Sequence, residues 1–312
     1  MTKNKNTDWF RDAKYGVFFH YLSDIQNIAN QQNGLSMGKE TSWDECVNEF
    51  DAVKFAKDIA HTGAAYVMFT FLQRTKYMIA PNEAYNKYTG YKTGEACSTR
   101  DLMADIIAEL DKYDIKMMPY FTSAGPYCDP QAKKGFNLEC VERMEASPEF
   151  MKKWFEVARE YSLRYGERIH GWWVDGAHLK GYNDKTLSEF ADNLRAGNEK
   201  SIVAFNPGDA EIDVRYWSAA DDYTAGERNK LYAQTPKEKR WLNGIQWHCL
   251  APIGTMWACP EVCYTAEEII MQLKEVGDNE GVITYDLAVY RDGSLSKAQL
   301  ELLMEVKKAI RK

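Results

Sequence analysis

Short apolar segments alternate with amphipathic segments along this chain, and that alternation restricts the fold more than any other feature. The apolar runs cover residues 15–22, 64–72, 115–123 and 171–176 and predict buried strands. They begin about 50 residues apart, which leaves room for a helix and two loops between successive strands. Strands of an antiparallel sandwich recur at shorter intervals. The pattern therefore predicts parallel strands joined by helices.

Helical periodicity fills the intervals. Leu102, Ile106, Leu110 and Tyr113 lie on one helical face, and Gly63 marks the end of an earlier helix. Further helices are predicted over 53–61, 149–165, 186–195, 265–276 and 297–310, and further strands over 201–206, 216–222, 244–250 and 281–287. About eight strands with their helices predict an α/β fold, a TIM-like (β/α)8 barrel occupying residues 1–312 as one domain. An open doubly wound sheet is the alternative, but no Gly-rich phosphate-binding turn follows any predicted strand.

Charge and composition narrow the classes of partner. The 39 Lys and Arg residues against 46 Asp and Glu give a net charge of −7, which argues against nucleic acid or an anionic membrane. No apolar run approaches the roughly 18 residues of a membrane span, and the polar start before Trp9 lacks a secretory signal. We therefore expect a cytoplasmic location. The seven cysteines are scattered, which predicts free thiols in a reducing compartment: Cys46, Cys97, Cys128, Cys140, Cys249, Cys259 and Cys263.

In barrel enzymes the active site lies at the carboxyl ends of the strands. That rule selects polar residues that end the predicted strands: His20, the stretch 72–74, Tyr120, Asp175, Asn206 and Asp222. Asp175 follows Trp173 and Val174 as a carboxylate at the tip of an apolar strand. Because side chains alternate along a strand, Trp173 and Asp175 share one face. We expect Asp175 to lie at the mouth of the barrel above an aromatic ring; the structural alternative is an Asp that only caps the next loop.

Aromatic residues near the predicted strand ends suggest a carbohydrate ligand, since sugar C–H faces stack on flat rings. They include Trp43, Trp173, Trp257 and Tyr120, although most such rings could equally pack loops against the barrel. The pair Cys259 and Cys263 is weak evidence for metal, and no zinc-binding histidine spacing occurs, so no metal or cofactor is predicted. A Gly-x-Ser-x-Gly elbow is absent, which disfavours a serine hydrolase.

Several motifs, in order, resemble the retaining α-L-fucosidases. The opening run from Trp9 to His20 is similar to that family's Trp-Phe-x-x-Ala-Lys-Phe-Gly-Ile-Phe-x-His-Trp. Thr99-Arg-Asp-Leu102 is similar to its Lys-Arg-Asp-Leu, and Trp172-Trp-Val-Asp-Gly176 resembles its Leu-Trp-Phe-Asp-Gly. Asp222-Tyr-Thr-Ala-Gly-Glu227 resembles its Asp-Tyr-x-Thr-Pro-Glu, and the stretch 280–295 resembles its closing strand and Asp-Gly turn.

The resemblance implies a retaining exo-glycosidase with two catalytic carboxyl groups. Asp175 would be the nucleophile that forms a covalent glycosyl-enzyme, and Glu227 the acid/base. Gly226 departs from the family's proline at the residue before Glu227. A retaining pair needs carboxyl groups about 5–5.5 Å apart. The strand-end positions, the aromatic residues and the resemblance together predict a sugar-binding set of His20, Trp43, Gln73, Arg74, Tyr120, Trp173, Asn206, Asp222 and Trp257.

The chain departs from the family pattern around the sugar. The family's Lys-His-His-Asp-Gly-Phe segment aligns with Leu72-Gln73-Arg74-Thr-Lys-Tyr77, without histidine, and its Glu-Trp dyad is reduced to Ser42-Trp43. Its Asn-Asp-Arg-Trp-Gly becomes Asn206-Pro-Gly208. These changes predict an altered pocket for the terminal sugar, in which Arg74 could pair with a carboxylate or sulfate. The family's C-terminal β-sandwich is not expected here, because the sequence ends at the last helix of the barrel.

Three functions remain open at this point. A small oligosaccharide or glycoside is the expected ligand of the glycosidase, and the oligomeric state is not predicted. A non-catalytic carbohydrate-binding barrel derived from such an enzyme is the second possibility, favoured by the missing histidines. A barrel hydrolase or isomerase of another chemistry is the third, and a metal requirement would support it.

Overall fold

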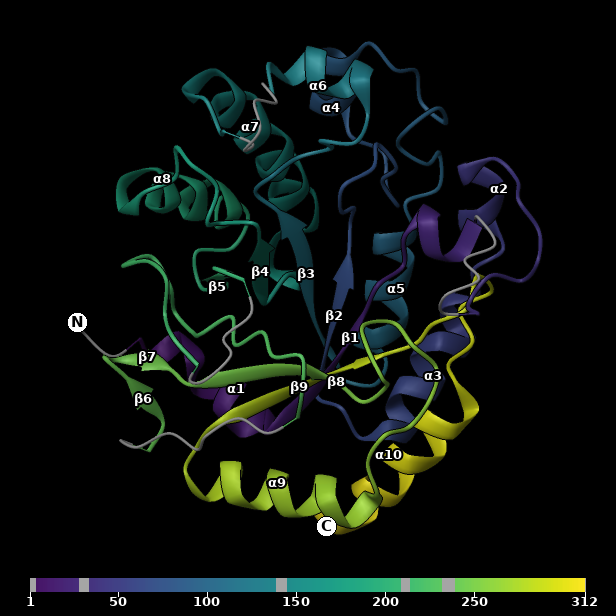
Figure 1. Ribbon diagram of the computed structural model, residues 1–312, viewed down its shortest axis with the longest axis vertical. Helices are drawn as coiled ribbons and strands as arrows, with labels where there is room; N and C mark the ends of the chain where they lie inside the picture. Colours follow the sequence, from purple (N-terminus) through teal and green to yellow (C-terminus); the bar gives the residue numbers. More distant parts are fainter. Residues whose placement is uncertain (1–3, 28–33, 139–144, 209–213, 232–238, 312) are drawn as a thin grey trace.

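A curled sheet of seven parallel strands forms the centre of the computed structural model (Figure 1). The structure describes residues 4–27, 34–138, 145–208, 214–231 and 239–311. The strands lie in the order β5-β4-β3-β2-β1-β9-β8. Their bounds are β1 Tyr15–Phe19, β2 Tyr66–Thr70, β3 Lys116–Thr122, β4 Gly171–Asp175, β5 Ile202–Phe205, β8 His248–Pro252 and β9 Val282–Leu287. A separate antiparallel pair consists of β6 Trp241–Leu242 and β7 Ile245–Gln246.

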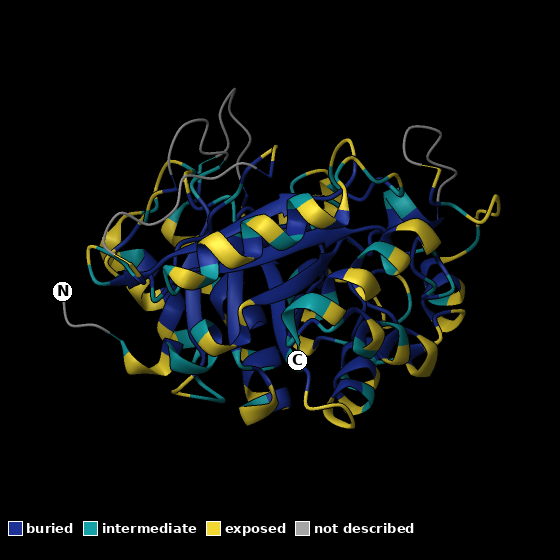
Figure 2. Ribbon diagram, turned by 90° about the horizontal axis from the view of Figure 1, so that it is seen from below, coloured by how far each residue is buried: buried dark blue, intermediate teal, exposed yellow. Residues whose placement is uncertain are grey.

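Helices surround the sheet and bury one face each. The longer helices are α3 Ala52–Thr62, α5 Leu102–Asp111, α7 Pro148–Tyr165, α8 Asp184–Leu194, α9 Ala266–Asp278 and α10 Lys297–Ile310. The shorter ones are η1 Lys5–Thr7, α1 Asp8–Ala13, η2 Ser23–Asn27, α2 Trp43–Asn48, α4 Glu83–Thr89, α6 Pro130–Phe136 and η3 Gly166–Arg168. Figure 2 shows the exposed residues on the outer faces of these helices, while the strands between them are buried. None of the described helices is long and apolar enough to span a membrane.

The sequence sets the helix ends through side-chain caps. Ser147 accepts a hydrogen bond from the backbone N–H of Phe150 and is followed by a proline in the first turn of α7. Gly63 ends α3 in the left-handed conformation, as the sequence predicted. Thr265 forms a capping box with Glu268 at the start of α9. These local signals explain why the predicted helices begin and end within a few residues of the observed ones.

Side chains on the two faces of the sheet form two separate cores. Trp172 and Val174 pack outward with the helices, whereas Trp173 packs inward with Phe18 and Tyr120. The inner core also contains Phe10 of α1, so this helix covers the amino ends of the strands. The alternation along β4 therefore places Asp175 above an inner aromatic ring, as predicted.

The expected eight-stranded barrel is shown only in part. The strand predicted over 216–222 does not form, because the buried Asp221 carboxylate accepts backbone N–H groups of Phe205, Trp217 and Ser218 and holds this stretch in a turn. The next segment, 222–228, runs between the two edge strands of the sheet. It bonds to Val203 of β5 on one side and to Leu250 of β8 on the other. The result is a seven-stranded parallel sheet of the α/β class that is consistent with a TIM-like barrel.

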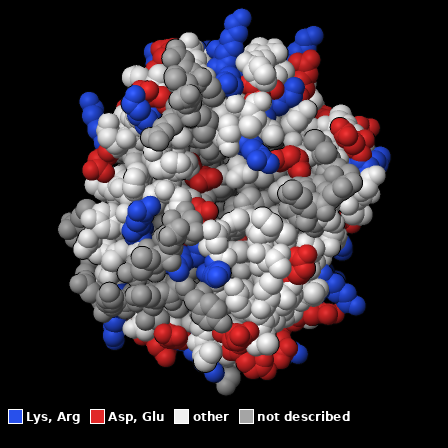
Figure 3. Space-filling model, viewed as in Figure 1, with Lys and Arg blue, Asp and Glu red and all other residues white. Residues whose placement is uncertain are grey.

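Lys and Arg side chains are interspersed with Asp and Glu side chains over the described part of the face shown in Figure 3. The described cysteines are free thiols, of which Cys46, Cys97, Cys249 and Cys259 are buried. Cys140 lies outside the described residues. Among the described side chains, no group of three or more His, Cys, Asp or Glu is arranged to hold a metal ion.

Candidate active site

A cavity of about 330 Å³ opens at the carboxyl ends of the strands. It brings together eight of the predicted site residues: His20, Gln73, Arg74, Tyr120, Trp173, Asp175, Glu227 and Trp257. Five further residues that the sequence did not single out complete the wall: Phe18, Ile25, Leu250, Met256 and Ala258. All five are apolar or small; Phe18 lies in the motif that ends at His20, and Met256 and Ala258 flank Trp257, so proximity to predicted residues is the signal that could have found these three. The cavity thus combines two carboxylates with aromatic and aliphatic surface.

Asp175 is the last residue of β4 and both of its carboxyl oxygens accept hydrogen bonds. Its Oδ2 accepts from the Tyr120 hydroxyl at 2.7 Å. Its Oδ1 accepts from the Gly176 N–H at 2.8 Å and from Asn206 Nδ2 at 2.9 Å. Burial first, and then the charge of Asp175, raises the pKa of Tyr120 well above its ordinary value, so the phenol keeps its proton and donates. Three donors therefore fix the Asp175 carboxylate in one orientation.

Asn206 joins the two carboxylates of the cavity. It follows β5 directly, is fully buried, and its Nδ2 donates to Asp175 Oδ1 and to Glu227 Oε2. The Asn206 Oδ1 accepts the N–H of Gly208, which fixes the orientation of the amide. The sequence predicted Asn206 as a sugar contact, but it does not line the cavity, and its amide hydrogens are used by the two acids. This bridging role could not be predicted from the sequence, because it depends on the distances between three side chains that come together only in the folded protein.

Glu227 reaches the cavity because the segment before it passes close to β8. A Cβ on Gly226 would lie 2.1 Å from the carbonyl oxygen of His248, and Gly226 has φ +67°. Backbone bonds from Leu250 to Gly226 and from Arg228 to Leu250 hold the residues on either side of Glu227. Proline, which has φ near −65°, cannot adopt this conformation. The close approach of the His248 carbonyl oxygen and the positive φ therefore explain why glycine occupies position 226.

Arg74 lies at the rim and already has an acidic partner. Its Nε and Nη2 donate to Asp24 Oδ2 at 3.0 and 2.7 Å. A sulfate or carboxylate on a sugar would have to compete with Asp24 for this guanidinium. The sequence-based hypothesis of an anionic sugar is therefore weakened by a neighbour that lies 50 residues away in the chain.

The model of the alpha-L-fucosidase family matches residues 1–311. The chain belongs to the alpha-L-fucosidase family. A search of curated protein sequences finds no significant match.

Solved structures share the fold of this family member at low sequence identity. An endo-fucoidan hydrolase from glycoside hydrolase family 107 is 16% identical with a TM-score of 0.73, covering 97% of this chain and 92% of that chain. A family 29 α-L-fucosidase from Bacteroides thetaiotaomicron is 14% identical with a TM-score of 0.68, covering 98% of this chain and 73% of that chain. The same bacterium's enzyme, trapped as a covalent intermediate with 2-fluoro-fucosyl fluoride in a glutamate-to-glutamine variant, has 14% identity, a TM-score of 0.67, and coverage of 98% and 74%.

Two residues expected to bind sugar in this family member lie elsewhere. The indole of Trp43 is buried in the outer core and donates to the carbonyl oxygen of Met78 at 2.8 Å. Asp222 pairs with Arg195 and accepts the backbone N–H of Val203, at the start of the segment 222–228 that carries Glu227. The sequence predicted a strand that ends at Asp222, but the segment between the edge strands begins there and carries Glu227 to the carboxyl ends. Asp222 therefore lies near the amino ends of the strands. Neither residue lines the cavity.

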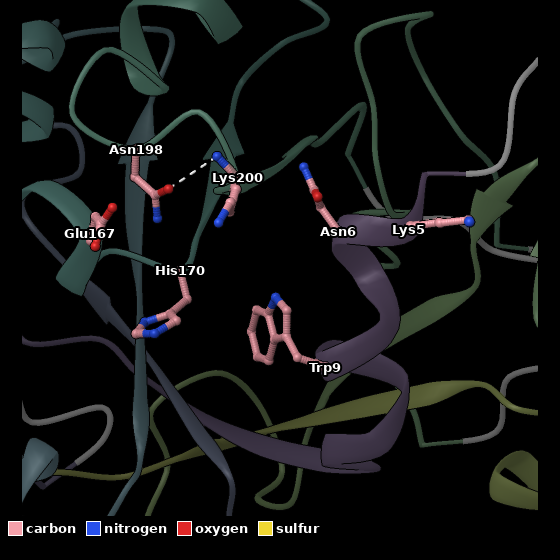
Figure 4. Close-up of a pocket in the computed structure, with 7 residues that line it drawn as sticks. All are labelled: Lys5, Asn6, Trp9, Glu167, His170, Asn198 and Lys200. Atoms are coloured by element: carbon pink, nitrogen blue, oxygen red, sulfur yellow. Dashed lines mark hydrogen bonds between the residues drawn. The ribbon is translucent and has the colours of Figure 1, made fainter.

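A second cavity, of about 400 Å³, lies at the opposite end of the strands (Figure 4). Its residues come just before β1, β4 and β5 in the chain: Lys5, Asn6, Trp9, Glu167, His170, Asn198 and Lys200. The Asn198 side chain accepts the backbone N–H of Lys200 and donates to the carbonyl oxygen of Ile169. Burial lowers the pKa of His170, whose ring contacts Trp9. The Asn198 side chain thus bonds to the protein's own backbone, whereas His170 Nδ1 is buried without a hydrogen-bond partner.

Proposed function

We propose that this protein is a retaining exo-glycosidase of the α-L-fucosidase type, with Asp175 as nucleophile and Glu227 as acid/base. The single observation that carries the proposal is the Asn206 amide, which donates one N–H to each carboxylate. Two acceptor oxygens that bond to one amide nitrogen lie within about 6 Å of each other. Retaining glycosidases hold their carboxyl groups about 5–5.5 Å apart, whereas inverting enzymes need more room for a water molecule.

The contacts of each acid fit different steps of this reaction. In the first step an Asp175 oxygen bonds to the anomeric carbon, the bond from that carbon to the leaving oxygen breaks, and Glu227 gives its proton to the leaving oxygen. In the second step Glu227 takes a proton from water, whose oxygen bonds to the same carbon and releases Asp175. The Asn206 amide donates to Glu227 Oε2 and thereby orients the carboxyl group that exchanges the proton in both steps.

The cavity suits one terminal sugar. Its volume of about 330 Å³ is at the lower end of the range for small-molecule sites, about 300–1,000 Å³. Phe18, Trp173 and Leu250 give it an apolar wall suited to a sugar C–H face or a methyl group, and His20 and Gln73 supply polar groups for hydroxyls. This combination supports a deoxy sugar such as fucose.

The test is hydrolysis of a panel of aryl glycosides, led by the α-L-fucoside, by wild-type protein and by Asp175→Asn. We expect release of the aryl group by the wild type and a loss on the order of 10⁴-fold or more in the variant. NMR of the first-formed sugar should show the anomer of the substrate. A variant at the exposed Asp12, Asp12→Asn, serves as a control and should retain activity.

Two results would contradict the proposal. An inverted anomer would exclude the covalent step. Tight binding of a glycoside by wild type and by Asp175→Asn, with no turnover by the wild type on the panel, would leave sugar binding as the function.

A further inference from the structure

The His20 side chain is held from several sides at the edge of the cavity. It follows β1, is 8% exposed, and its ring contacts the rings of Phe18 and Trp257 with centroids 4.4 and 5.9 Å away. Its Nδ1 lies 2.8 Å from Asp286 Oδ1. The Nδ1 side of the ring is therefore turned toward Asp286.

Asp286 is a buried carboxylate of β9 that the proposed reaction does not use. It is 1% exposed and lies opposite Phe18 in the pairing of β9 with β1. Its Oδ1 is occupied by His20, and its Oδ2 accepts the backbone N–H of Ala258 at 2.7 Å. Among the described residues, no lysine or arginine forms an ion pair with it. A buried carboxylate needs partners of this kind, and these two are both parts of the cavity wall.

We propose that Asp286 is a positioning residue that sets the tautomer of His20 and fixes the turn carrying Trp257. An ionised carboxylate only accepts hydrogen bonds, so His20 must hold a proton on Nδ1. In the neutral ring, Nε2 then offers a lone pair to a sugar hydroxyl in the cavity. The effect on activity rests on the proposed function, whereas the tautomer does not.

The second contact of Asp286 stabilises an unfavourable backbone conformation. Ala258 has φ +57°, a region that non-glycine residues seldom occupy. Its N–H donates to Asp286, and the two preceding residues, Met256 and Trp257, line the cavity. One carboxylate thus couples the orientation of His20 to the position of the Trp257 ring.

Asp286→Asn should change the contact with His20 while it keeps the contact with the Ala258 N–H, because asparagine has almost the same shape as aspartate. The Ala258 N–H still needs an acceptor, so the amide oxygen takes the place of Oδ2 and the amide nitrogen faces His20 Nδ1. That nitrogen can only donate, which forces Nδ1 to become the acceptor and moves the ring proton to Nε2. The group presented to the sugar changes from an acceptor to a donor.

The first test is ¹⁵N NMR of histidine-labelled protein, with His20→Gln to assign the His20 signals. We expect the wild-type ring to carry its proton on Nδ1 and the Asp286→Asn ring to carry it on Nε2. Ala258→Gly relaxes the backbone at the other contact and should leave the tautomer unchanged. A wild-type proton on Nε2, or an Asp286→Asn spectrum equal to wild type, would overturn the proposal. The wild-type spectrum decides it even if the variant does not fold.

The second test is steady-state kinetics on the glycoside that the wild type hydrolyses. Asp286→Asn should raise KM about tenfold and lower kcat less, since a hydroxyl contact in the bound sugar is lost while both catalytic acids remain. An unchanged KM would overturn the role in sugar binding. A wild type without activity would count against the proposed function, and the NMR result would still decide the role of Asp286.

Discussion

The two ends of the sheet each hold a cavity of similar size, yet their side chains are used differently. At the carboxyl ends, Asp175 and Glu227 share one amide donor and face open space. At the amino ends, the side-chain amide of Asn198 forms hydrogen bonds with neighbouring backbone groups (Figure 4). Cavity volume alone therefore does not identify a site. Two carboxyl groups held by one side-chain amide are the stronger indication, because like charges placed close together repel each other and do not favour folding.

The strongest test compares a glutamate from each end. Glu227→Gln should lower kcat/KM on the order of 10²–10⁴-fold, because the leaving oxygen loses its proton donor. The loss should be smaller for aryl leaving groups that need no proton. Glu167→Gln, on the exposed rim of the other cavity, should leave the rates unchanged. Equal losses in both variants would remove the functional distinction between the two ends.

The buried histidine between the ends gives a pH prediction. His248 is fully buried, its Nδ1 donates to the Thr224 carbonyl and its Nε2 accepts from Thr284, and burial lowers its pKa to about 4. Between pH 6.5 and 4 the unfolded chain binds the proton and the folded one does not. The contribution of neutral His248 to the free energy of unfolding is therefore fully present above about pH 6.5, and it falls by about 3 kcal/mol toward pH 4.

Urea unfolding at pH 7 and pH 4 measures this change. His248→Gln should be less stable at pH 7 but should lose less stability on acidification than the wild type. His61→Gln, at an exposed position in α3, should behave as the wild type. If His248→Gln loses as much unfolding free energy between pH 7 and pH 4 as the wild type does, then other groups cause the acid sensitivity.

The side-chain amides of Asn206 and Asn198, one at each end of the sheet, should respond differently to replacement by alanine. Asn206→Ala should lower kcat/KM about 10- to 100-fold, because both acids lose a shared donor. Asn198→Ala removes two backbone contacts and should cost about 1–2 kcal/mol of folding free energy without changing kcat/KM. Kinetics and denaturation of both variants check this. If Asn206→Ala is fully active, the bridge does not position the acids.

Arg74→Ala should have the smallest effect. Arg74 is exposed and paired with Asp24, and such surface pairs contribute about 0–1 kcal/mol. We expect less than a tenfold change in kcat/KM, equal for neutral and sulfated glycosides. A selective loss on the sulfated substrate would restore the sequence-based hypothesis that this cation recognises an anionic sugar.

The parts of the fold that depend on local patterns could be predicted from the sequence. The inward position of Trp173 below Asp175 follows from alternation along one strand, and the end of α3 at Gly63 follows from backbone conformation. The turn at Asp221 could not be predicted, because the carboxylate that replaces the strand ladder accepts N–H groups from two separate parts of the chain.

The amino-acid sequence was enough to predict the α/β class, the order of most strands and helices, and the position of Asp175 at a strand end. Periodicity and capping depend on residues that are close in the sequence, so both can be recognised from the sequence. The folded structure was needed to show that Asn206 bridges Asp175 and Glu227, and that Trp43 and Asp222 lie away from the cavity. Those outcomes depend on distances between strands that meet only after folding, and hydrogen bonds are sensitive to a few tenths of an ångström.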